Sequence, residues 1–228
     1  MEKSQVTLKH LGIIADGNRR WAKENNLPKI EGHKRGLKTI ETLVGAAAKA
    51  GIPYITFYVF STENWGREKS EVDYIMKLAE TKIMKMAEKM AENNIKLLIL
   101  GSRGKVNPTL TSLGEKAEKI TEECTGTTVC FCFNYCGEQE IADAANIAME
   151  ADGEITPETI RKHLYHPEVP DLDMVVRTSG EERISGFMLW RSAYAELMFL
   201  KKYFPEMEAD DIKAILEEYN RRNRRFGK

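Results

Sequence analysis

Long apolar runs and an excess of charge of one sign are both missing from this sequence. Its longest apolar stretches, residues 55–60 and 129–133, are far shorter than the roughly 20 residues that a membrane-spanning helix needs. Lys and Arg total 34 against 35 Asp and Glu, so the formal net charge is −1. This balance argues against a protein that holds nucleic acid on a basic surface. The first residues also lack the basic-then-apolar pattern of a signal peptide, and we expect a cytoplasmic protein.

Cysteine is scarce, and the four that occur are Cys124, Cys130, Cys132 and Cys136. Their spacing matches no common zinc or iron–sulfur pattern, although their closeness leaves a metal site as the alternative interpretation. Free cysteine behaves as a small apolar residue in protein interiors. We therefore expect reduced thiols packed in the core.

Short β-branched runs alternate with longer segments of helical period, a pattern typical of a parallel sheet with helices on its faces. The 228 residues, 42% of them hydrophobic, can bury one large core, and no linker or repeat divides them. We predict an α/β fold with a single domain over residues 1–228 and a mostly parallel six-stranded central sheet flanked by helices. The strands are expected at 10–15, 55–60, 96–101, 128–134, 174–177 and 196–200, and the helices at 33–51, 70–93, 138–150, 157–164 and 210–225.

Asp16 follows the first expected strand, and ligands of open parallel sheets bind beyond the carboxyl ends of the strands. A carboxylate there, followed by Gly17 and the start of a helix, suits a diphosphate bound with Mg²⁺, which takes one or two protein carboxylates and fills its other positions with phosphate oxygen and water. Asp16 could instead serve only as a helix N-cap. Arg19 and Arg20 favour the phosphate site, because guanidinium groups are planar, forked phosphate ligands.

Further candidates follow from the same rule. His33 stands between two glycines close to the Asp16 loop, and those glycines would let a phosphate approach. Arg177 ends the fifth strand, with Arg183 and Ser185 close behind. These basic groups indicate two phosphorylated ligands or one very anionic ligand. The glycine-rich loops that bind nucleotides in the usual ways are absent.

Several segments of the chain resemble, in order and spacing, the signature blocks of the cis-prenyltransferases. The resemblance runs from about residue 10 to residue 227. The segments are Asp16-Gly17-Asn18-Arg19-Arg20-Trp21-Ala22-Lys23, Gly32-His33-Lys34, Phe60-Ser61-Thr62-Glu63-Asn64-Trp65, Arg177-Thr178-Ser179-Gly180-Glu181, Arg183-Ile184-Ser185, Leu189-Trp190 and Ala193-Tyr194-Ala195-Glu196-Leu197.

The resemblance implies a homodimeric, Mg²⁺-dependent transferase. Such an enzyme condenses isopentenyl diphosphate with an allylic prenyl diphosphate, forms a Z double bond and releases pyrophosphate. By position, Asp16 and Glu196 would be the metal-associated carboxylates. The groups that hold the allylic diphosphate would be Gly17, Asn18, Arg19, Arg20 and His33. Those that bind isopentenyl diphosphate would be Arg177, Arg183 and Ser185.

The resemblance also assigns the remaining site residues. Ser61 and Asn64 stand where the family removes a proton from the isopentenyl unit, and with Asp16 and His33 they form the expected catalytic set. Arg225 and Gly227 match a motif that reaches into the partner subunit's site. The other expected substrate-binding residues are Trp21, Lys29, Trp65 and Arg67.

A growing hydrocarbon needs a dry space, so we also expect a hydrophobic product tunnel. The Met-rich helix at 70–93 would form its wall, since Met adapts to irregular apolar shapes. If Phe131 or Phe133 faces this tunnel, the cavity is shortened and the product is a short or medium chain. Product release would then bring the protein into peripheral contact with a membrane.

Some positions depart from the family pattern. The departures are Ala15, Lys29, Phe133, Cys136, Glu138 and Gly186. Lys29 keeps the charge of the usual Arg but lacks its fork. With these altered loops, an alternative reaction is an irregular coupling, in which two allylic units are joined other than head to tail.

Two further alternatives concern the function of the chain as a whole. It could be a non-catalytic partner subunit, or an Mg²⁺-dependent phosphohydrolase with Asp16 as nucleophile.

Overall fold

The computed structural model describes residues 8–222. Its strands are β1 (His10–Ile14), β2 (Tyr54–Ser61), β3 (Lys96–Leu100), β4 (Thr128–Tyr135), β5 (Met174–Arg177) and β6 (Glu196–Phe199). Its α-helices are α1 (Asn18–Glu24), α2 (Lys29–Lys49), α3 (Lys69–Glu92), α4 (Pro108–Ile120), α5 (Gly137–Ala151), α6 (Pro157–His163) and α7 (Ala209–Arg221). Two short 3-10 helices are η1 (Thr62–Gly66) and η2 (Phe204–Glu206).

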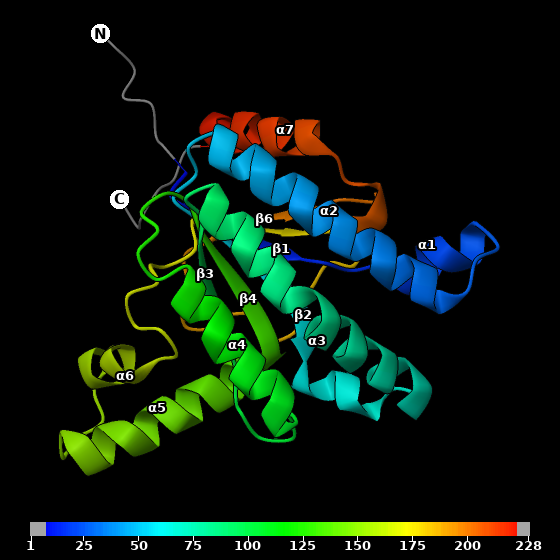
Figure 1. The fold of residues 1–228 in the computed structure, drawn as a ribbon. Coiled ribbons are helices and arrows are strands. Elements are labelled where there is room, and N and C mark those ends of the chain that lie inside the picture. Colours follow the sequence, from blue (N-terminus) through cyan, green and yellow to red (C-terminus); the bar gives the residue numbers. More distant parts are fainter. Residues whose placement is uncertain (1–7, 223–228) are drawn as a thin grey trace, which may run out of the picture.

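The six strands form one sheet in the order β3-β4-β2-β1-β5-β6, and every neighbouring pair is parallel (Figure 1). The predicted α/β fold with a six-stranded sheet is confirmed, and each strand lies within one residue of its expected bounds at either end. Parallel strands must be joined by crossovers, which helices supply everywhere except between β5 and β6, where the connection is irregular. All the carboxyl ends therefore lie at one edge of the sheet.

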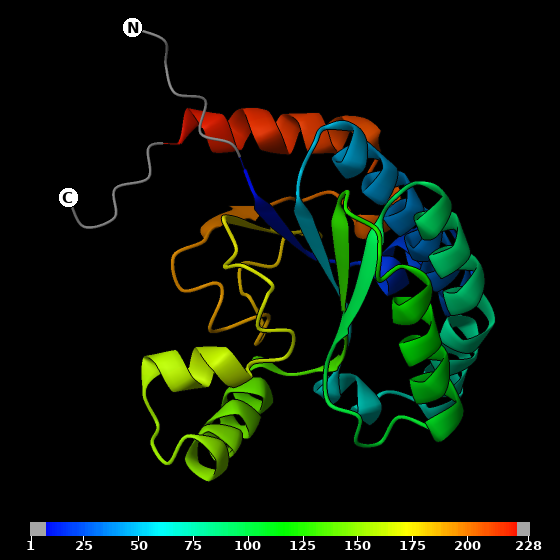
Figure 2. The ribbon, with the colours of Figure 1, turned by 60° about the vertical axis from the view of Figure 1, so that its left-hand side comes forward.

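Side chains alternate between the two faces of the sheet, as strand geometry requires. Ile55 and Phe57 of β2 belong to the core under α2, α3, α4 and α7, while Tyr58 belongs to a second core on the opposite face. Figures 1 and 2 show these four helices packed together on one side. The second face is covered mainly by the irregular chain between α6 and β6, whose Phe187 lies over Gly12.

Two helices differ from expectation. α4 was not predicted, although Asn107 caps it by accepting a hydrogen bond from the Leu110 amide at 2.8 Å and Pro108 stands in its first turn. α2 begins at Lys29, four residues before the expected start. The sequence does not mark this start, because Pro28 takes the position where a polar capping residue usually stands. His33 therefore lies one turn inside the helix.

The remaining sequence expectations for the core are met in part. Cys130 and Cys132 are free and buried, as predicted, whereas Cys124 and Cys136 are only half-buried. The helix expected to reach residue 225 ends at Arg221, and residues beyond 222 are outside the described part. No helix within residues 8–222 is long and apolar enough to cross a membrane.

A buried ion pair fastens the irregular segment to α5. The side chains of Arg191 and Glu140 are 0% and 1% exposed, and their nearest atoms are 2.7 Å apart. Arg191 also donates to the carbonyl oxygens of Val169, Tyr165 and His166 at 3.2, 2.8 and 3.1 Å. Every nitrogen of the guanidinium has a partner, which is the condition under which such a buried charge is tolerated.

We predict that Arg191→Met lowers the free energy of unfolding by about 3–5 kcal/mol, because Glu140 is left buried without its counter-charge. Arg161→Met is the matched control: Arg161 forms an exposed pair with Asp171, and its loss costs under about 1 kcal/mol. Urea unfolding followed by circular dichroism measures both. Equal losses for the two variants would contradict the prediction.

Candidate active site

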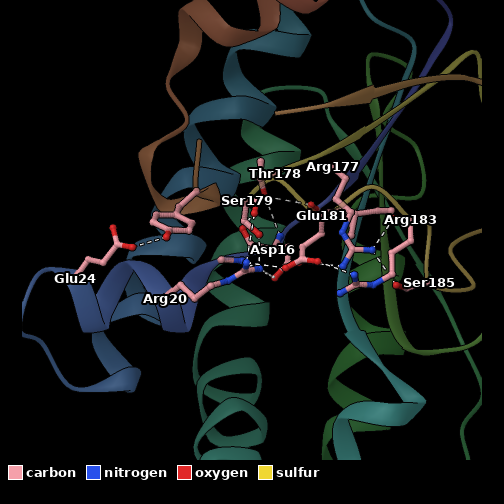
Figure 3. Close-up of polar contacts among 12 residues, drawn as sticks. Asp16, Arg20, Glu24, Arg177, Thr178, Ser179, Glu181, Arg183 and Ser185 are labelled. Atoms are coloured by element: carbon pink, nitrogen blue, oxygen red, sulfur yellow. Dashed lines mark hydrogen bonds and ion pairs between the residues drawn. The ribbon is translucent and has the colours of Figure 1, made fainter. Parts of the chain in front are cut away.

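Asp16 lies directly beyond the carboxyl end of β1, at the centre of the polar contacts in Figure 3. Its carboxylate oxygen Oδ1 accepts from the Gly17 amide at 2.7 Å, and Oδ2 accepts from Arg177 Nη2 at 3.0 Å. Its backbone is held as well, because the Thr178 hydroxyl accepts from the Asp16 amide and donates to the Asp16 carbonyl. The loops after β1 and β5 are thereby locked together.

Gly17 makes the turn from β1 into α1 possible. Its φ of +101° is one that glycine adopts readily and other residues avoid. A Cβ atom at this position would also lie only 2.6 Å from the Tyr203 ring. A side chain here would therefore require Tyr203 or Ser179 to move.

Arg177 is the buried cation of the site, with its side chain 6% exposed. Besides Asp16, it donates to the Arg183 carbonyl at 2.6 Å and to the Ser185 hydroxyl at 2.8 Å. Its Nε atom is buried and has no hydrogen-bond partner among the described residues. The predicted grouping of Arg177, Arg183 and Ser185 is thus present in the structure, and Asp16 joins it.

Glu181 links two arginines from opposite sides of this edge. Its carboxylate pairs with Arg20 of α1 at 2.8 Å and with Arg183 at 2.6 Å. Arg20 also lies 3.2 Å from Asp16 and donates to the Ser179 hydroxyl (Figure 3). The cations predicted from separate loops therefore converge, held by two carboxylates.

Asp16 is held in its ionised form. Burial alone would raise its pKa, but the hydrogen bond and charge of Arg177, with the charge of Arg20, outweigh burial and lower the pKa. Its negative charge persists at neutral pH. The ion pairs that it makes would weaken only as pH falls through this lowered value.

A pocket of about 720 Å³ opens beside Asp16. Its lining brings together the loop after β1, residues of α1 and α2 with the turn between them, and the residue that follows η1. Most of its polar side chains are cationic. We call it the phosphate pocket; it is lined by Ala15, Asp16, Gly17, Asn18, Arg19, Arg20, Lys23, Leu27, Pro28, Lys29, His33 and Arg67. Eight of these are residues that the sequence predicted. Lys29 reaches the pocket wall while paired with Glu68 at 2.7 Å.

His33 is mostly buried, and its Nε2 atom lies 3.2 Å from Glu71 of α3. Burial lowers its pKa and outweighs the opposing effect of Glu71. The glycines on either side of it do not open a path for phosphate, contrary to the expectation. A Cβ at Gly32 would lie 2.0 Å from the Asn18 carbonyl, and one at Gly36 would lie 2.6 Å from the Asn18 side chain, so these glycines let α1 pack on α2.

Ser61 and Asn64 lie where β2 passes into η1. The Asn64 side chain accepts from the Ser61 amide at 3.3 Å, which fixes the turn. Trp65 packs edge-on against Phe60, and its ring nitrogen donates to the Asn134 side chain at 2.7 Å. These residues lie at the same sheet edge as Asp16 but do not line the phosphate pocket.

An apolar pocket of about 220 Å³ adjoins the phosphate pocket, and the two share Ala15, Asn18 and His33. It lies among α2, α3, α4 and the sheet. Phe131 and Phe133 of β4 both line it. From the Met-rich helix α3 come Ile75, Leu78, Ala79, Lys82, Ile83 and Met86, so only one methionine of that helix lines the pocket.

Glu196 does not join Asp16 within one chain. It begins β6, in register with Met174 at the start of β5, and therefore lies at the amino end of the sheet. There it pairs with Arg222 at 3.1 Å. Ligands of parallel sheets bind at the carboxyl ends of the strands, whereas Glu196 stands at the amino end of its strand.

Of three further predicted residues, one lies in the described part of the chain and two do not. Trp21 lies half-buried on α1 and does not line either pocket. Arg225 and Gly227 fall outside the described residues. No role was predicted from the sequence for Glu181, Glu71 or Thr178. Glu181 and Thr178 stand inside the segment after β5 that was singled out, where their closeness to Arg177 and Arg183 was the available signal.

The donor set is compatible with one hard cation. Within residues 8–222 no group of three or more His, Cys, Asp or Glu side chains could hold a metal ion. Asp16 is a single partly exposed carboxylate on the pocket wall, surrounded by groups suited to phosphate. That arrangement fits Mg²⁺, which takes few protein ligands and the rest from phosphate oxygen and water.

Sequence comparison places the chain among prenyltransferases. Residues 14–227 match the family described as "Putative undecaprenyl diphosphate synthase". An isoprenyl transferase of Neisseria gonorrhoeae is 42% identical over 221 residues, which cover 96% of this chain and 89% of that protein. One from Thermotoga maritima is 41% identical over 223 residues and 96% of each chain.

Comparison with solved structures agrees. Lavandulyl diphosphate synthase of Lavandula x intermedia, solved with dimethylallyl diphosphate, superposes with a TM-score of 0.93 at 28% identity over 99% of this chain and 100% of that one. A Campylobacter jejuni protein, "a probable undecaprenyl diphosphate synthase", gives 0.84 at 30% identity over 97% and 99% of the two chains. With its sequence matched over nearly its full length and its sheet, helices and arginine-lined edge in place, the chain belongs to the undecaprenyl diphosphate synthase family of prenyltransferases.

Proposed function

We propose that this chain condenses isopentenyl diphosphate with an allylic prenyl diphosphate, using Mg²⁺, to form a Z-configured polyprenyl diphosphate and pyrophosphate. The observation that carries the proposal is the Asp16–Arg177 contact at 3.0 Å. It joins the phosphate pocket on one side to the Arg183–Ser185 group on the other. Two anionic substrates could thus lie next to each other, with an apolar pocket adjoining.

The phosphate pocket would bind the allylic diphosphate. Breaking its allylic C–O bond builds negative charge on the departing pyrophosphate, and fixed cations stabilise that charge in the transition state. Arg19, Arg20, Lys29 and Arg67 supply them. Lys29, where the family usually has Arg, contributes a point charge without a bidentate fork.

Arg177, Arg183 and Ser185 would bind the diphosphate of isopentenyl diphosphate. Arg177 lies between the Asp16 carboxylate and the Ser185 hydroxyl, so its charge would attract a diphosphate held at this point. Holding the second substrate at this edge brings its double bond toward the allylic carbon, and orientation of this kind lowers the barrier of a bimolecular step.

Asp16 would hold Mg²⁺, which supplies electrostatic neutralisation of the diphosphate charge when bound. Within one chain Glu196 is too far along the sheet to share that ion, so any metal role for Glu196 requires another subunit. Ser61 and Asn64, at the end of β2, would take part in removing the proton from the isopentenyl unit. Their mutual hydrogen bond fixes their geometry.

The apolar pocket would receive the growing hydrocarbon as a tunnel. Burial of one five-carbon isoprene unit contributes roughly 4 kcal/mol at ~0.8 kcal/mol per CH₂ group. Ala15, Asn18 and His33 line both pockets, so a chain that grows from the diphosphate can pass directly into this space. The cytoplasmic location and a membrane contact during product release stay predictions.

The purified protein is expected to release pyrophosphate and to form polyprenyl diphosphates from isopentenyl diphosphate and an allylic primer. Mass spectrometry of the products, with several primers and with Mg²⁺ or EDTA, measures this, and activity should be lost in EDTA. Asp16→Ala should abolish turnover, because it removes the metal carboxylate and the partner of Arg177. Near-normal activity of this variant would place the metal site elsewhere.

The same assay separates the alternatives. Dimethylallyl diphosphate offered alone yields no product if coupling is regular, whereas an irregular synthase would join two allylic units. A non-catalytic subunit would turn over nothing by itself. A phosphohydrolase would release phosphate without an isoprenoid acceptor.

Shortening the aromatic residues in the apolar pocket is expected to lengthen the product. Phe131→Ala and Phe133→Ala each remove a ring that lines the pocket, and the freed volume admits further isoprene units. Reversed-phase chromatography of dephosphorylated products measures chain length. Leu98→Ala is the control, since Leu98 is buried on the opposite face of the sheet. Unchanged length in both Phe variants would contradict the role of these rings.

We further propose a homodimer formed along β6. Within residues 8–222 the only strand that pairs with β6 is β5, and the far edge of β6 is contacted by the Arg222 side chain, which donates to the Leu197 carbonyl at 2.8 Å. Nearby Tyr194 and Leu197 are 77% and 40% exposed. Open strand edges and exposed apolar residues together are typical of interfaces. A dimer here would also bring Glu196 next to a second chain.

Leu197→Glu is therefore expected to convert the dimer to a monomer, because a charge is placed in an apolar contact. Sedimentation velocity measures the change. Ile120→Glu is the matched control, since Ile120 is 41% exposed at the end of α4, well away from β6. A dimer that survives Leu197→Glu, or an unmodified protein that sediments as a monomer, would contradict the proposal.

A further inference from the structure

Glu71 is a buried carboxylate behind the wall of the phosphate pocket. It lies in the first turn of α3 and is 6% exposed. It is not the N-cap of that helix, a position taken by Glu68, and it is not among the residues that line the pocket. A buried charge needs compensating partners, so the contacts of Glu71 indicate its role.

All three partners of Glu71 are residues of the pocket wall. His33 Nε2 lies 3.2 Å and Arg67 Nη1 lies 3.1 Å from Oε1 of Glu71. Arg19 Nε lies 3.7 Å from Oε2. The three come from α2, from the residue after η1 and from α1, so one carboxylate connects three segments that are distant in the chain.

Glu71 carries a negative charge in this setting. Burial would raise its pKa, but the hydrogen bond from His33 and the charges of Arg67 and Arg19 outweigh burial and lower it. Its Oε2 atom is buried and accepts no hydrogen bond among the described residues. The carboxylate is therefore not fully satisfied by local packing, and its charge acts mainly on the three groups in front of it.

We propose that Glu71 is a positioning residue of the phosphate pocket, which fixes Arg19, His33 and Arg67 in the orientation that receives the allylic diphosphate. This inference rests on the proposed function of the pocket. Glu71 accepts hydrogen bonds from Nε2 of His33 and Nη1 of Arg67, and attracts Arg19 by charge alone. Glu71 leaves the remaining N–H groups of the two guanidiniums unused, and these are the donors suited to a diphosphate.

Two opposing effects follow from this arrangement. The negative charge of Glu71 weakens the attraction of the three groups for a diphosphate, because Glu71 repels the diphosphate and offsets part of the positive charge in the pocket wall. In return the groups are preorganised, and misplacement of such groups by about 1 Å can cost on the order of a hundredfold in rate. A positioning residue thus affects turnover far more than affinity.

Glu71→Gln tests the proposal, because it keeps the shape of the side chain and removes the charge. We expect kcat to fall about tenfold or more. The Kd for inorganic pyrophosphate, measured by calorimetry, should stay within about threefold or become tighter. Glu71→Asp keeps the charge and should lose less activity than Glu71→Gln. Asp73→Asn is the matched control: Asp73 lies two residues further along α3, exposed and paired with Lys69, and its loss should change neither quantity.

The measurements also identify failure. A kcat for Glu71→Gln within about twofold of the unmodified enzyme overturns the proposal. So does a parallel fall in kcat, pyrophosphate affinity and Tm, which would mark Glu71 as an ordinary tie between helices. If Glu71→Gln does not accumulate as folded protein, Glu71→Asp carries the same test, with reduced kcat and retained pyrophosphate affinity expected.

A spectroscopic measurement keeps this inference separate from the proposed function. The ring nitrogen resonances of His33, identified by their loss in His33→Gln, should shift in Glu71→Gln and not in Asp73→Asn. Unshifted resonances overturn the positioning role. Failure of the proposed function would show instead as no turnover by the unmodified protein with isopentenyl diphosphate and any allylic primer, while the pyrophosphate titration and the resonances still decide the role of Glu71.

Discussion

All six strands run in the same direction, and the site depends on that constraint. Parallel strands place every carboxyl end at one edge, so residues that follow β1, β2 and β5 meet there although more than a hundred positions separate the first from the last. The Asp16–Arg177 contact is the direct result, since β1 and β5 are neighbours in the sheet and Ile14 lies in register with Arg177. The same constraint carries Glu196 to the opposite end.

A site built for diphosphates must hold an excess of cations before any ligand binds. Carboxylates placed between the cationic groups offset this excess. Asp16 lies between Arg177 and Arg20, and Glu181 lies between Arg20 and Arg183. Glu71 lies behind Arg19, His33 and Arg67. Each carboxylate lowers repulsion among its neighbours and fixes their directions. Preorganisation of this kind is what electrostatic stabilisation of a leaving group requires.

Polar and apolar spaces adjoin at a few residues. Ala15, Asn18 and His33 line both pockets, so the edge that holds phosphate is also the entrance to a space for hydrocarbon. The close packing of α1 on α2 over Gly32 and Gly36 sets this boundary. Family membership, the charge pattern of the edge and the apolar pocket thus agree on a prenyl diphosphate chemistry.

The sequence by itself determined the fold class, the six strands and most pocket residues, because period-two apolar runs and the residues after them are local features. It also pointed to Arg177, Arg183 and Ser185 as one group and to Asp16 at the same edge of the sheet, since the parallel-sheet rule brings strand ends together. Only the tertiary structure decided that Glu181 and Glu71 bind the arginines, that Gly32 and Gly36 serve helix packing, and that Glu196 lies away from Asp16. Helix α4 was not predicted, because a capping residue followed by a proline is a weak signal of a helix compared with a long apolar stripe of helical period. The contacts of Glu181, Glu71, Gly32 and Gly36 and the position of Glu196 depend on which side chains meet across segments and on strand register, and no local pattern encodes either one.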